Sequence, residues 1–518
     1  MYSPSLLRLT GVLPCVLAGL PAAAAQNDTN YWPWQTYKSS AAAPPLLNIS
    51  KSGPTSPGYL FFDQNGDYAH KYSLFIMTDD NELVWQSPVA DYSAFRAQTF
   101  EGRPVLTFMN GITLSEPYGF GHGIIQLLDD SYESIYNVSL TAAEEHFVTI
   151  PELNATELYS YLDMHEALIT PQDTILVTEY NITQTDLSSI GGPVDGWVAD
   201  SLFYELDIKT NDILFRWSAL DHLSQIPFSD EIEFKPLGDS GQNRSIPYGF
   251  FHINSVDKFE DGSYLISSRY YCSIFRVSRD GTIEWTLQGQ TGGDFKLGDG
   301  ASFCYQHDAR ILREEGTKLQ ISLFDNANSN IVSGVDQTRG LYLTLDTATS
   351  EATLDQAFFD PHDTVYALSQ GNTQTLPNGH VVMGYGSTPK IREYDPAGVP
   401  VMTAQFGPGD SKVFSYRAYK LPWVGRPKTA PDVFACIDGA RDHTRVYMSW
   451  NGATEHAAWE VLTGSAESSL TRSARVRKTG FETMASVPGL AAYVQVEAHG
   501  KNGTLMASSS VIVPQGSC

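Results

Sequence analysis

The sequence has few charged residues, and positive ones are the scarcer kind. Charged residues make up 18% of the 518 residues, and 33 lysines and arginines against 59 aspartates and glutamates give a net charge of −26. Such an acidic chain is repelled by nucleic acid and by anionic membranes, so we expect neither as a partner, although a local basic pocket can lie inside an acidic shell. Hydrophobic residues make up 42%, which indicates a globular protein rather than a disordered one.

Long hydrophobic runs are missing as well. The apolar run from Val12 to Leu20 is too short to cross a bilayer, no later segment is long enough, and the C-terminus lacks the tail of a lipid anchor. Arg8 before this run and the small residues Ala23 to Ala25 after it are typical of a signal peptide, which we place at residues 1–25. We therefore expect a secreted, extracellular protein without a transmembrane segment.

Cysteine is scarce too: the chain has five, and Cys15 leaves with the signal peptide. The four that remain permit two disulfides in three connectivities, of which we favour Cys272–Cys304 and Cys436–Cys518. The first closes a loop of about thirty residues, worth roughly 3–4 kcal/mol of stability by the chain-entropy estimate. Buried free thiols are the alternative, and the spacing fits no zinc template.

The sequence also contains sites for N-glycosylation, which agrees with export of the protein. Seven Asn-x-Ser/Thr sequences behind a signal peptide indicate a glycoprotein, whereas a single one occurs easily by chance. The seven acceptors are Asn27, Asn48, Asn137, Asn154, Asn181, Asn243 and Asn502.

Several catalytic motifs are absent. The chain has no nucleophile-elbow sequence of the serine hydrolases, no phosphate-binding loop and no dinucleotide fingerprint. A nucleotide or sulfonucleotide donor therefore has no visible cradle, and we expect no cofactor.

What the sequence does have is a repeat. From Gly58 onwards a strand, a turn, two further strands and a Gly/Asp turn before an aromatic residue recur, ending for example at Trp85, Trp217 and Trp285. The spacing is typical of four-stranded propeller blades, so we expect an all-β protein with a six-bladed β-propeller over residues 26–424. A pair of ordinary β-sandwiches is the alternative. The six predicted blades lie near residues 58–95, 100–140, 160–220, 248–290, 303–350 and 362–405.

The pattern changes after Trp423, where Pro422, Pro427 and Pro431 indicate a linker. The short alternating strands that follow predict an Ig-like or fibronectin-III-like β-sandwich over residues 425–518. Its predicted strands are 433–436, 445–450, 458–462, 493–498 and 509–513.

One hairpin of the fourth predicted blade collects polar groups. His252 and Asn254 are two residues apart in a strand, so their side chains should project to the same face. Folding the chain at the Asp261-Gly262 turn brings Arg269 roughly opposite His252. An imidazole, an amide and a bidentate guanidinium suit a tetrahedral oxyanion such as sulfate or phosphate.

Equivalent polar residues precede the hairpins of neighbouring blades. His165 and His307 each stand at the start of a first strand, and Gln370 and Asn372 do so in a later blade. First strands line the channel of a propeller, so these side chains should converge, although a lone histidine there is more often a packing residue. His122, in a Gly-rich loop, is a further candidate for the channel.

Eight other histidines do not stand at the start of a blade's first strand, and we interpret them as surface or packing residues. A catalytic metal is a rival use of His165, His252 and His307. We expect no metal, because Arg269 in the same cluster would repel a cation. The eight are His70, His146, His222, His362, His380, His443, His456 and His499.

A set of short stretches is specific as a set: Leu106-Thr107-Phe108 with Gly121-His122-Gly123, His252-x-Asn254-Ser255-Val256, Gln306-His307-Asp308-Ala309, 321–327 (ISLFDNA), 340–343 (GLYL), 369–372 (SQGN) and 392–395 (REYD). Together these stretches resemble the fungal arylsulfotransferase-like proteins. The resemblance covers roughly residues 55–425 and the C-terminal sandwich.

The resemblance implies a reaction and roles. Bacterial members of the superfamily are six-bladed propellers that move a sulfuryl group between phenols through a sulfated histidine, without a sulfonucleotide. By similarity His307 is the nucleophile, His252, Asn254 and Arg269 bind sulfate, and His165 is an additional channel histidine. An expected threonine has only Thr373 as its candidate, and the bacterial N-terminal dimerisation domain has no counterpart, so the oligomeric state stays open.

Three functions follow as hypotheses. The first is sulfuryl transfer between aryl sulfates and phenols, with a small phenolic compound or aryl sulfate as the partner. The second is tailoring of a secondary metabolite, by cyclisation or isomerisation, in the same channel. The third is a non-catalytic propeller that binds glycans or proteins at the cell surface.

Overall fold

The structure is a computed structural model. It describes residues 24–26, 30–114, 119–140, 160–234, 237–332, 336–409 and 411–518. Most of the predicted signal peptide, His146 and the glycosylation sites Asn27 and Asn154 lie outside the described residues. Within them no helix is long and apolar enough to cross a membrane. The described part is an all-β protein whose only helices are the short 3-10 turns η1 (Ser188–Ile190), η2 (Leu220–His222), η3 (Phe228–Asp230) and η4 (Glu467–Ser469).

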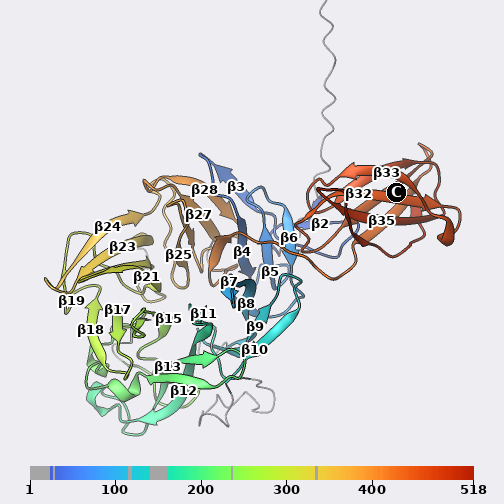
Figure 1. Cartoon of the computed structure of the whole chain (residues 1–518). Coiled ribbons are helices and arrows are strands. Elements are labelled where there is room, and N and C mark those ends of the chain that lie inside the picture. Colours follow the sequence, from blue (N-terminus) through green and yellow to red (C-terminus); the bar gives the residue numbers. More distant parts are fainter. Residues whose placement is uncertain are drawn as a thin grey trace, which may run out of the picture.

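Six sheets of four or five strands follow one another around a common centre (Figure 1). Each predicted segment supplies most of one sheet. In sheet order the strands are β29 (Ala418–Leu421), β4 (Tyr59–Gln64), β5 (Ser73–Met77), β6 (Leu83–Gln86); β7 (Tyr92–Phe100), β8 (Arg103–Thr113), β9 (Gly121–Leu128), β10 (Ser134–Val138); β11 (Ala167–Ile169), β12 (Thr174–Thr185), β13 (Gly196–Asp207), β14 (Ile213–Ser218); β15 (Ile253–Lys258), β16 (Tyr264–Ser268), β17 (Ser273–Val277), β18 (Ile283–Gln288), β19 (Gly292–Gly293); β21 (His307–Glu315), β22 (Lys318–Asp325), β23 (Arg339–Asp346), β24 (Glu351–Phe358), β20 (Lys296–Leu297); and β25 (Asn372–Thr375), β26 (Val381–Gly384), β27 (Lys390–Tyr394), β28 (Pro400–Gln405), β3 (Asn48–Lys51).

Some strands are apolar throughout because neighbouring sheets cover both faces of the sheet to which they belong. Every residue of β5 is buried, so this strand is a continuous apolar run rather than an alternating one. On one side Phe62 and Phe75 pack into a core with Val382 of the next sheet, and on the other Phe61 packs with Phe95. Burial of such side chains stabilises the fold by about 1.5–3 kcal/mol each.

The two ends of the ring are joined by strands from distant parts of the chain. β29 pairs with β4, with Ala418 opposite Phe62 and Leu421 opposite Tyr59, and β3 pairs with β28. The first sheet therefore takes its innermost strand from the far end of the chain. The predicted segment 58–95 lacked this strand, because its partner lies some 350 residues later and leaves no local signal.

Two further four-stranded sheets share a core around Trp459 and Trp450. The predicted strand 509–513 does not form; one isolated bridge, between Val494 and Ile512, stands in its place. Four strands, β33, β34, β36 and β37, were not predicted. In sheet order the strands are β34 (Thr483–Pro488), β31 (His443–Ser449), β30 (Asp432–Asp438), β37 (Gln515–Ser517); and β33 (Thr471–Arg477), β32 (His456–Gly464), β35 (Tyr493–Gly500), β36 (Leu505–Ser508).

The C-terminal sheets are fastened to the six-sheet ring. Gly452 N–H donates to Val84 O at 2.8 Å, and the Asn451 amide bonds the backbone of Gln86 in both directions, so the turn after β31 extends the outer strand β6. The N-terminal segment adds a second tie, because Ser39 donates to the Glu482 carboxylate. This segment also contains a small sheet of β1 (Ala24–Gln26) and β2 (Trp34–Thr36).

Both disulfides join parts that are distant in sequence. Cys272 pairs with Cys304, which lies three residues before His307, and Cys436 pairs with Cys518. The first therefore ties the β15–β19 sheet to the chain entering β21, next to the candidate site. Among the described glycosylation acceptors four are exposed and Asn181 is half-buried; the four are Asn48, Asn137, Asn243 and Asn502.

Candidate active site

A cavity of about 590 Å³ lies where the chain enters the innermost strands of the sheets. β7, β11, β15, β21 and β25 are closest to the centre of the ring in Figure 1. The residues just before or at the start of four innermost strands line the cavity: His165, His252, His307 and Gln370. Arg269 joins them, so the structure brings together five of the predicted site residues.

His252 and Arg269 face each other as the turn at Asp261-Gly262 predicts, since Arg269 N–H donates to His252 O at 3.1 Å. Asn254 differs from the prediction. His252 has a left-handed backbone with φ of 54° and lies outside β15, and the ladder shifts between Ile253 and Ser255. The two-residue alternation is therefore broken, and Asn254 does not line the cavity.

The Asn254 side chain has a buried role. It donates to Gln306 O at 2.7 Å, which joins β15 to the chain entering β21. Its Oδ1 has no hydrogen-bond partner. Asn254 therefore joins two sheets behind the cavity and does not line it.

His165 and His252 are neighbours in the cavity. Their ring centres are 5.0 Å apart and their planes are nearly perpendicular. Nδ1 of His165 is hydrogen-bonded to the Asp163 carboxylate. A carboxylate in this position fixes the orientation of an imidazole, which suits a group that exchanges a proton.

His307 is buried and lies between two polar contacts. Its Nδ1 is 2.7 Å from Asn326 Oδ1, and Gln370 N–H donates to Nε2 at 3.2 Å. Burial and the charge of Arg269 hold the pKa of His307 well below its usual range. The pKa of His252 is lowered in the same way by burial and by His165 and Arg269. Both imidazoles are therefore neutral at physiological pH.

Five cavity residues carry buried polar atoms with no hydrogen-bond partner. These atoms are Oγ of Ser93, Nδ1 of His252, Nε of Arg269, Oε1 of Gln370 and the hydroxyl oxygen of Tyr416. Arg269 makes no ion pair among the described residues; it donates to Leu368 O at 2.8 Å and lies over the Tyr270 ring. Because buried polar groups are normally satisfied, such a set next to an unpaired guanidinium indicates a site for a polar, anionic ligand.

A buried ionic network lies next to these residues, and the sequence did not reveal it. Glu166 pairs with Arg310 at 2.6 Å and with Arg417 at 3.0 Å, while Asp308 pairs with Arg310 at 2.7 Å. Arg417 also donates to the carbonyls of His165 and Asn254. Arg417 thereby joins the β11, β15 and β29 sheets behind the cavity.

Only its position relative to a strand could have indicated Arg417 from the sequence. It precedes β29 as Glu166 precedes β11, and Tyr416 before it lines the cavity as His165 does. The rule that residues just before an innermost strand line the cavity could be applied to Tyr416 only after β29 was known to be such a strand.

The remaining candidates do not line the cavity. Asn372 exchanges two hydrogen bonds with the backbone of Ala418, at 2.9 and 2.8 Å, and so joins β25 to β29. Thr373 donates to Leu323 O at 3.2 Å. His122 is buried in β9, with its ring 6.3 Å from Tyr161.

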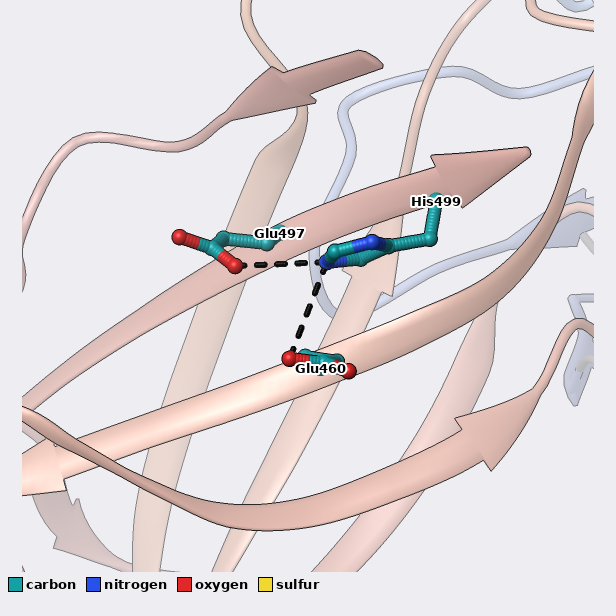
Figure 2. Close-up of side chains that lie close together, drawn as sticks. All are labelled: Glu460, Glu497 and His499. Carbon is teal, nitrogen blue, oxygen red and sulfur yellow. Dashed lines mark hydrogen bonds and ion pairs between the residues drawn. The ribbon is translucent and has the colours of Figure 1, made fainter. Parts of the chain in front are cut away.

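One cluster of metal-ligating side chains lies far from the cavity, on the C-terminal sheets. Figure 2 shows His499 between Glu460 and Glu497, and their ligand atoms lie within 4.8 Å of one another. Arg472 and Arg475 already pair with Glu460 at 3.1 and 3.0 Å. We therefore interpret the cluster as a network of ion pairs that is already satisfied by these arginines; a surface or packing role was predicted for His499.

The comparisons with known proteins now identify the family. Residues 96–407, more than half of the chain, match the family described as arylsulfotransferase (ASST). The chain belongs to the arylsulfotransferase family. The matched region contains His165, His252, Arg269, His307 and Gln370, so the candidate active site lies inside the arylsulfotransferase domain.

Similarity outside the family is low. No curated protein matches the chain. Similar solved structures include a Bacteroides caccae protein of unknown function (12% identity, 70% of this chain and 98% of that one, TM-score 0.37). Another is Penicillium chrysogenum alpha-L-arabinanase complexed with arabinobiose (9% identity, 76% and 94%, TM-score 0.34). A third is catalytically inactive virginiamycin B lyase from Staphylococcus aureus with quinupristin (10% identity, 78% and 96%, TM-score 0.29). All three scores are below 0.5, so these similarities support no conclusion about this arylsulfotransferase-family chain.

Proposed function

We propose that the protein moves a sulfuryl group from an aryl sulfate to a phenol through a covalent intermediate on His307. One observation carries the proposal: neutral His307 shares its cavity with the unsatisfied polar atoms of Arg269 and His252. A nucleophile needs an available electron pair, and His307 has one on Nε2 once the Gln370 N–H leaves it. The transferring group needs donors for its oxygens, and Arg269 and His252 lie in the same cavity to supply them. Membership of the arylsulfotransferase family supports the same reaction.

The two half-reactions use the same residues. Nε2 of His307 attacks sulfur, the bond from sulfur to the aryl oxygen breaks, and its electron pair leaves on the phenolate. Arg269 and His252 hold the remaining sulfuryl oxygens as charge shifts to the leaving group. His165, paired with Asp163, gives a proton to the phenolate. A second phenol then returns a proton to His165 and takes the sulfuryl group from His307, without a sulfonucleotide or another cofactor.

The cavity walls support an aromatic substrate. Beyond the polar cluster, the lining includes Phe120, Phe234, Tyr270, Ile331 and Tyr416. A volume of about 590 Å³ holds an aryl ring in addition to a sulfate group and is in the range of small-molecule sites.

We further propose the finer architecture and location. The six sheets form a six-bladed β-propeller over residues 26–424, closed by β29 and β3, and residues 425–518 form an Ig-like or fibronectin-III-like sandwich. The chain resembles the fungal branch of the family and is secreted after removal of residues 1–25, with glycans on its acceptor asparagines. Two disulfides and the exposure of four acceptors support an extracellular protein.

The test uses p-nitrophenyl sulfate as donor. Wild-type protein is expected to release nitrophenol at a rate that rises with added phenol, to form phenyl sulfate, and to give the parallel initial-rate lines of a ping-pong reaction without any sulfonucleotide. Release of nitrophenol with no phenyl sulfate formed would contradict transfer. Turnover of a sulfate-free aromatic substrate would support a tailoring enzyme instead, and ligand binding without turnover a binding protein.

A further inference from the structure

We infer that Asn326 is a positioning residue that makes Nε2 of His307 the attacking nitrogen. The inference rests on the proposed function and deepens it, because it assigns a role to a residue that does not line the cavity. Asn326 follows β22 directly, is completely buried and contacts His307 across the β21–β22 ladder.

The orientation of the Asn326 amide follows from its partners. Its Nδ2 donates to Ala367 O at 3.2 Å and to Gln370 O at 3.0 Å. Two carbonyl oxygens accept hydrogen bonds and cannot donate them, so the NH₂ group must point to them and Oδ1 must point to His307. Oδ1 is only an acceptor, and Nδ1 of His307, 2.7 Å away, must therefore carry a proton.

The other ring nitrogen is fixed as a consequence. A neutral imidazole with its proton on Nδ1 has its lone pair on Nε2. The group facing Nε2 is the Gln370 N–H, a donor, which agrees with a lone pair on Nε2. This hydrogen bond would be lost if Nε2 were protonated. Both neighbours of the ring thus select the same tautomer.

The selected tautomer suits the reaction. When Nε2 forms its bond to sulfur, the ring becomes an imidazolium whose remaining proton is on Nδ1. The hydrogen bond to Asn326 then becomes charge-assisted, and such bonds are roughly twice as strong as neutral ones. Asn326 therefore stabilises the charged ring more than the neutral one, which lowers the barrier to attack. The Gln370 N–H must leave Nε2 before attack and is then placed to donate to a sulfuryl oxygen.

A structural role is the alternative. Asn326 also holds the carbonyls of Ala367 and Gln370, so its loss could simply loosen the chain before β25. The two roles differ in what they do to the titration of His307. The charged or titratable groups that act on this ring are Arg269, His165, Arg417 and His252, and none of them changes when Asn326 is replaced.

The decisive variant is Asn326→Asp, which keeps the acceptor and nearly the same shape but adds a negative charge. The carboxylate should raise the pKa of His307, so the acid limb of kcat/KM for p-nitrophenyl sulfate is expected to move up by at least about one pH unit. Asn326→Ala should lower kcat about 10–100-fold, with a smaller change in KM. Asn378→Asp, in the turn between β25 and β26, is the matched control and should leave the limb in place. An unmoved limb in a folded Asn326→Asp protein would overturn the inference.

Two measurements do not depend on turnover. Modification of His307 by diethyl pyrocarbonate, followed by peptide mass spectrometry across pH, should show the same upward shift in Asn326→Asp, with His222 as internal reference. In wild-type protein labelled with ¹⁵N-histidine, the NMR signals of His307 are expected to give a protonated Nδ1 and an unprotonated Nε2. The opposite tautomer would overturn the inference even if no variant folds. These results also remain informative if aryl sulfates are not substrates, so failure of the inference is distinguishable from failure of the proposed function.

Discussion

His307→Ala is expected to lower kcat/KM for p-nitrophenyl sulfate at least about 10³-fold, because it removes the atom that forms the bond to sulfur. The loss should appear in both half-reactions, since donor and acceptor react at the same nitrogen. His252→Ala should cost less, about 10–100-fold, because it removes one donor to the sulfuryl oxygens and leaves Arg269.

The control for this loss is His443→Ala, a substitution of the same kind on the C-terminal sheets, outside the cavity. It should retain wild-type activity and so exclude a general effect of losing a histidine. A His307→Ala protein that is folded and releases nitrophenol at the wild-type rate would remove the basis of the proposed mechanism. Initial rates with p-nitrophenyl sulfate and phenol decide the matter.

The second large effect is expected on stability, from Glu166→Gln. Glu166 is completely buried and its charge is matched by Arg310 and Arg417. Without this carboxylate the two guanidinium groups share Asp308 as their one carboxylate partner among the described residues. One buried positive charge is then uncompensated, which costs about 3–5 kcal/mol of the free energy of unfolding. Because Arg417 also holds the carbonyls of His165 and Asn254, activity should fall as well. Chemical denaturation at neutral pH measures the stability change.

The stability that Glu166 contributes should depend on pH in a definite direction. The pKa of Glu166 is lowered from 4.5 to about 2, as the charges of Arg310 and Arg417 outweigh burial. A lowered pKa contributes stability that is fully present above pH 4.5 and is lost as pH falls towards 2. The wild type should therefore lose more stability than Glu166→Gln between these values. Glu133→Gln, in an exposed pair with Lys428, should change little, and an equal effect of both substitutions would contradict the account.

The repeat in the sequence predicted most of the ring, because each sheet is built from strands that are adjacent in sequence. Hairpin turns such as Asp261-Gly262 set the local pairing, and each predicted segment forms most of one sheet. β29 and β3 are exceptions, since each pairs with a strand about 350 residues away in sequence. Local patterns carry no information on such pairing, so the first sheet was predicted without its innermost strand.

The site was predicted in part for the same reason. His165, His252, His307 and Gln370 were found because they precede hairpins at equivalent positions. Asn254 was wrongly assigned to the cavity because the left-handed backbone at His252 and the shifted ladder break the alternation on which its assignment depended.

The supporting residues could not be found from spacing. Asn326 contacts His307 across a ladder whose register is visible only in three dimensions. Arg417 precedes a strand whose partner is distant in sequence, and no role was predicted for Glu166, with which Arg417 pairs. The cavity-lining residues recur at equivalent strand starts, whereas the residues that hold them in place depend on packing between sheets.

In the proposed reaction His307 carries the sulfuryl group during transfer. The most direct measurement is mass spectrometry of the His307 peptide after wild-type protein is mixed with p-nitrophenyl sulfate without acceptor and quenched in base. We expect a sulfuryl adduct on His307 that disappears when phenol is added and is absent from His307→Ala. Nitrophenol release with no adduct, or with the adduct on another residue, would rule out His307 as the carrier.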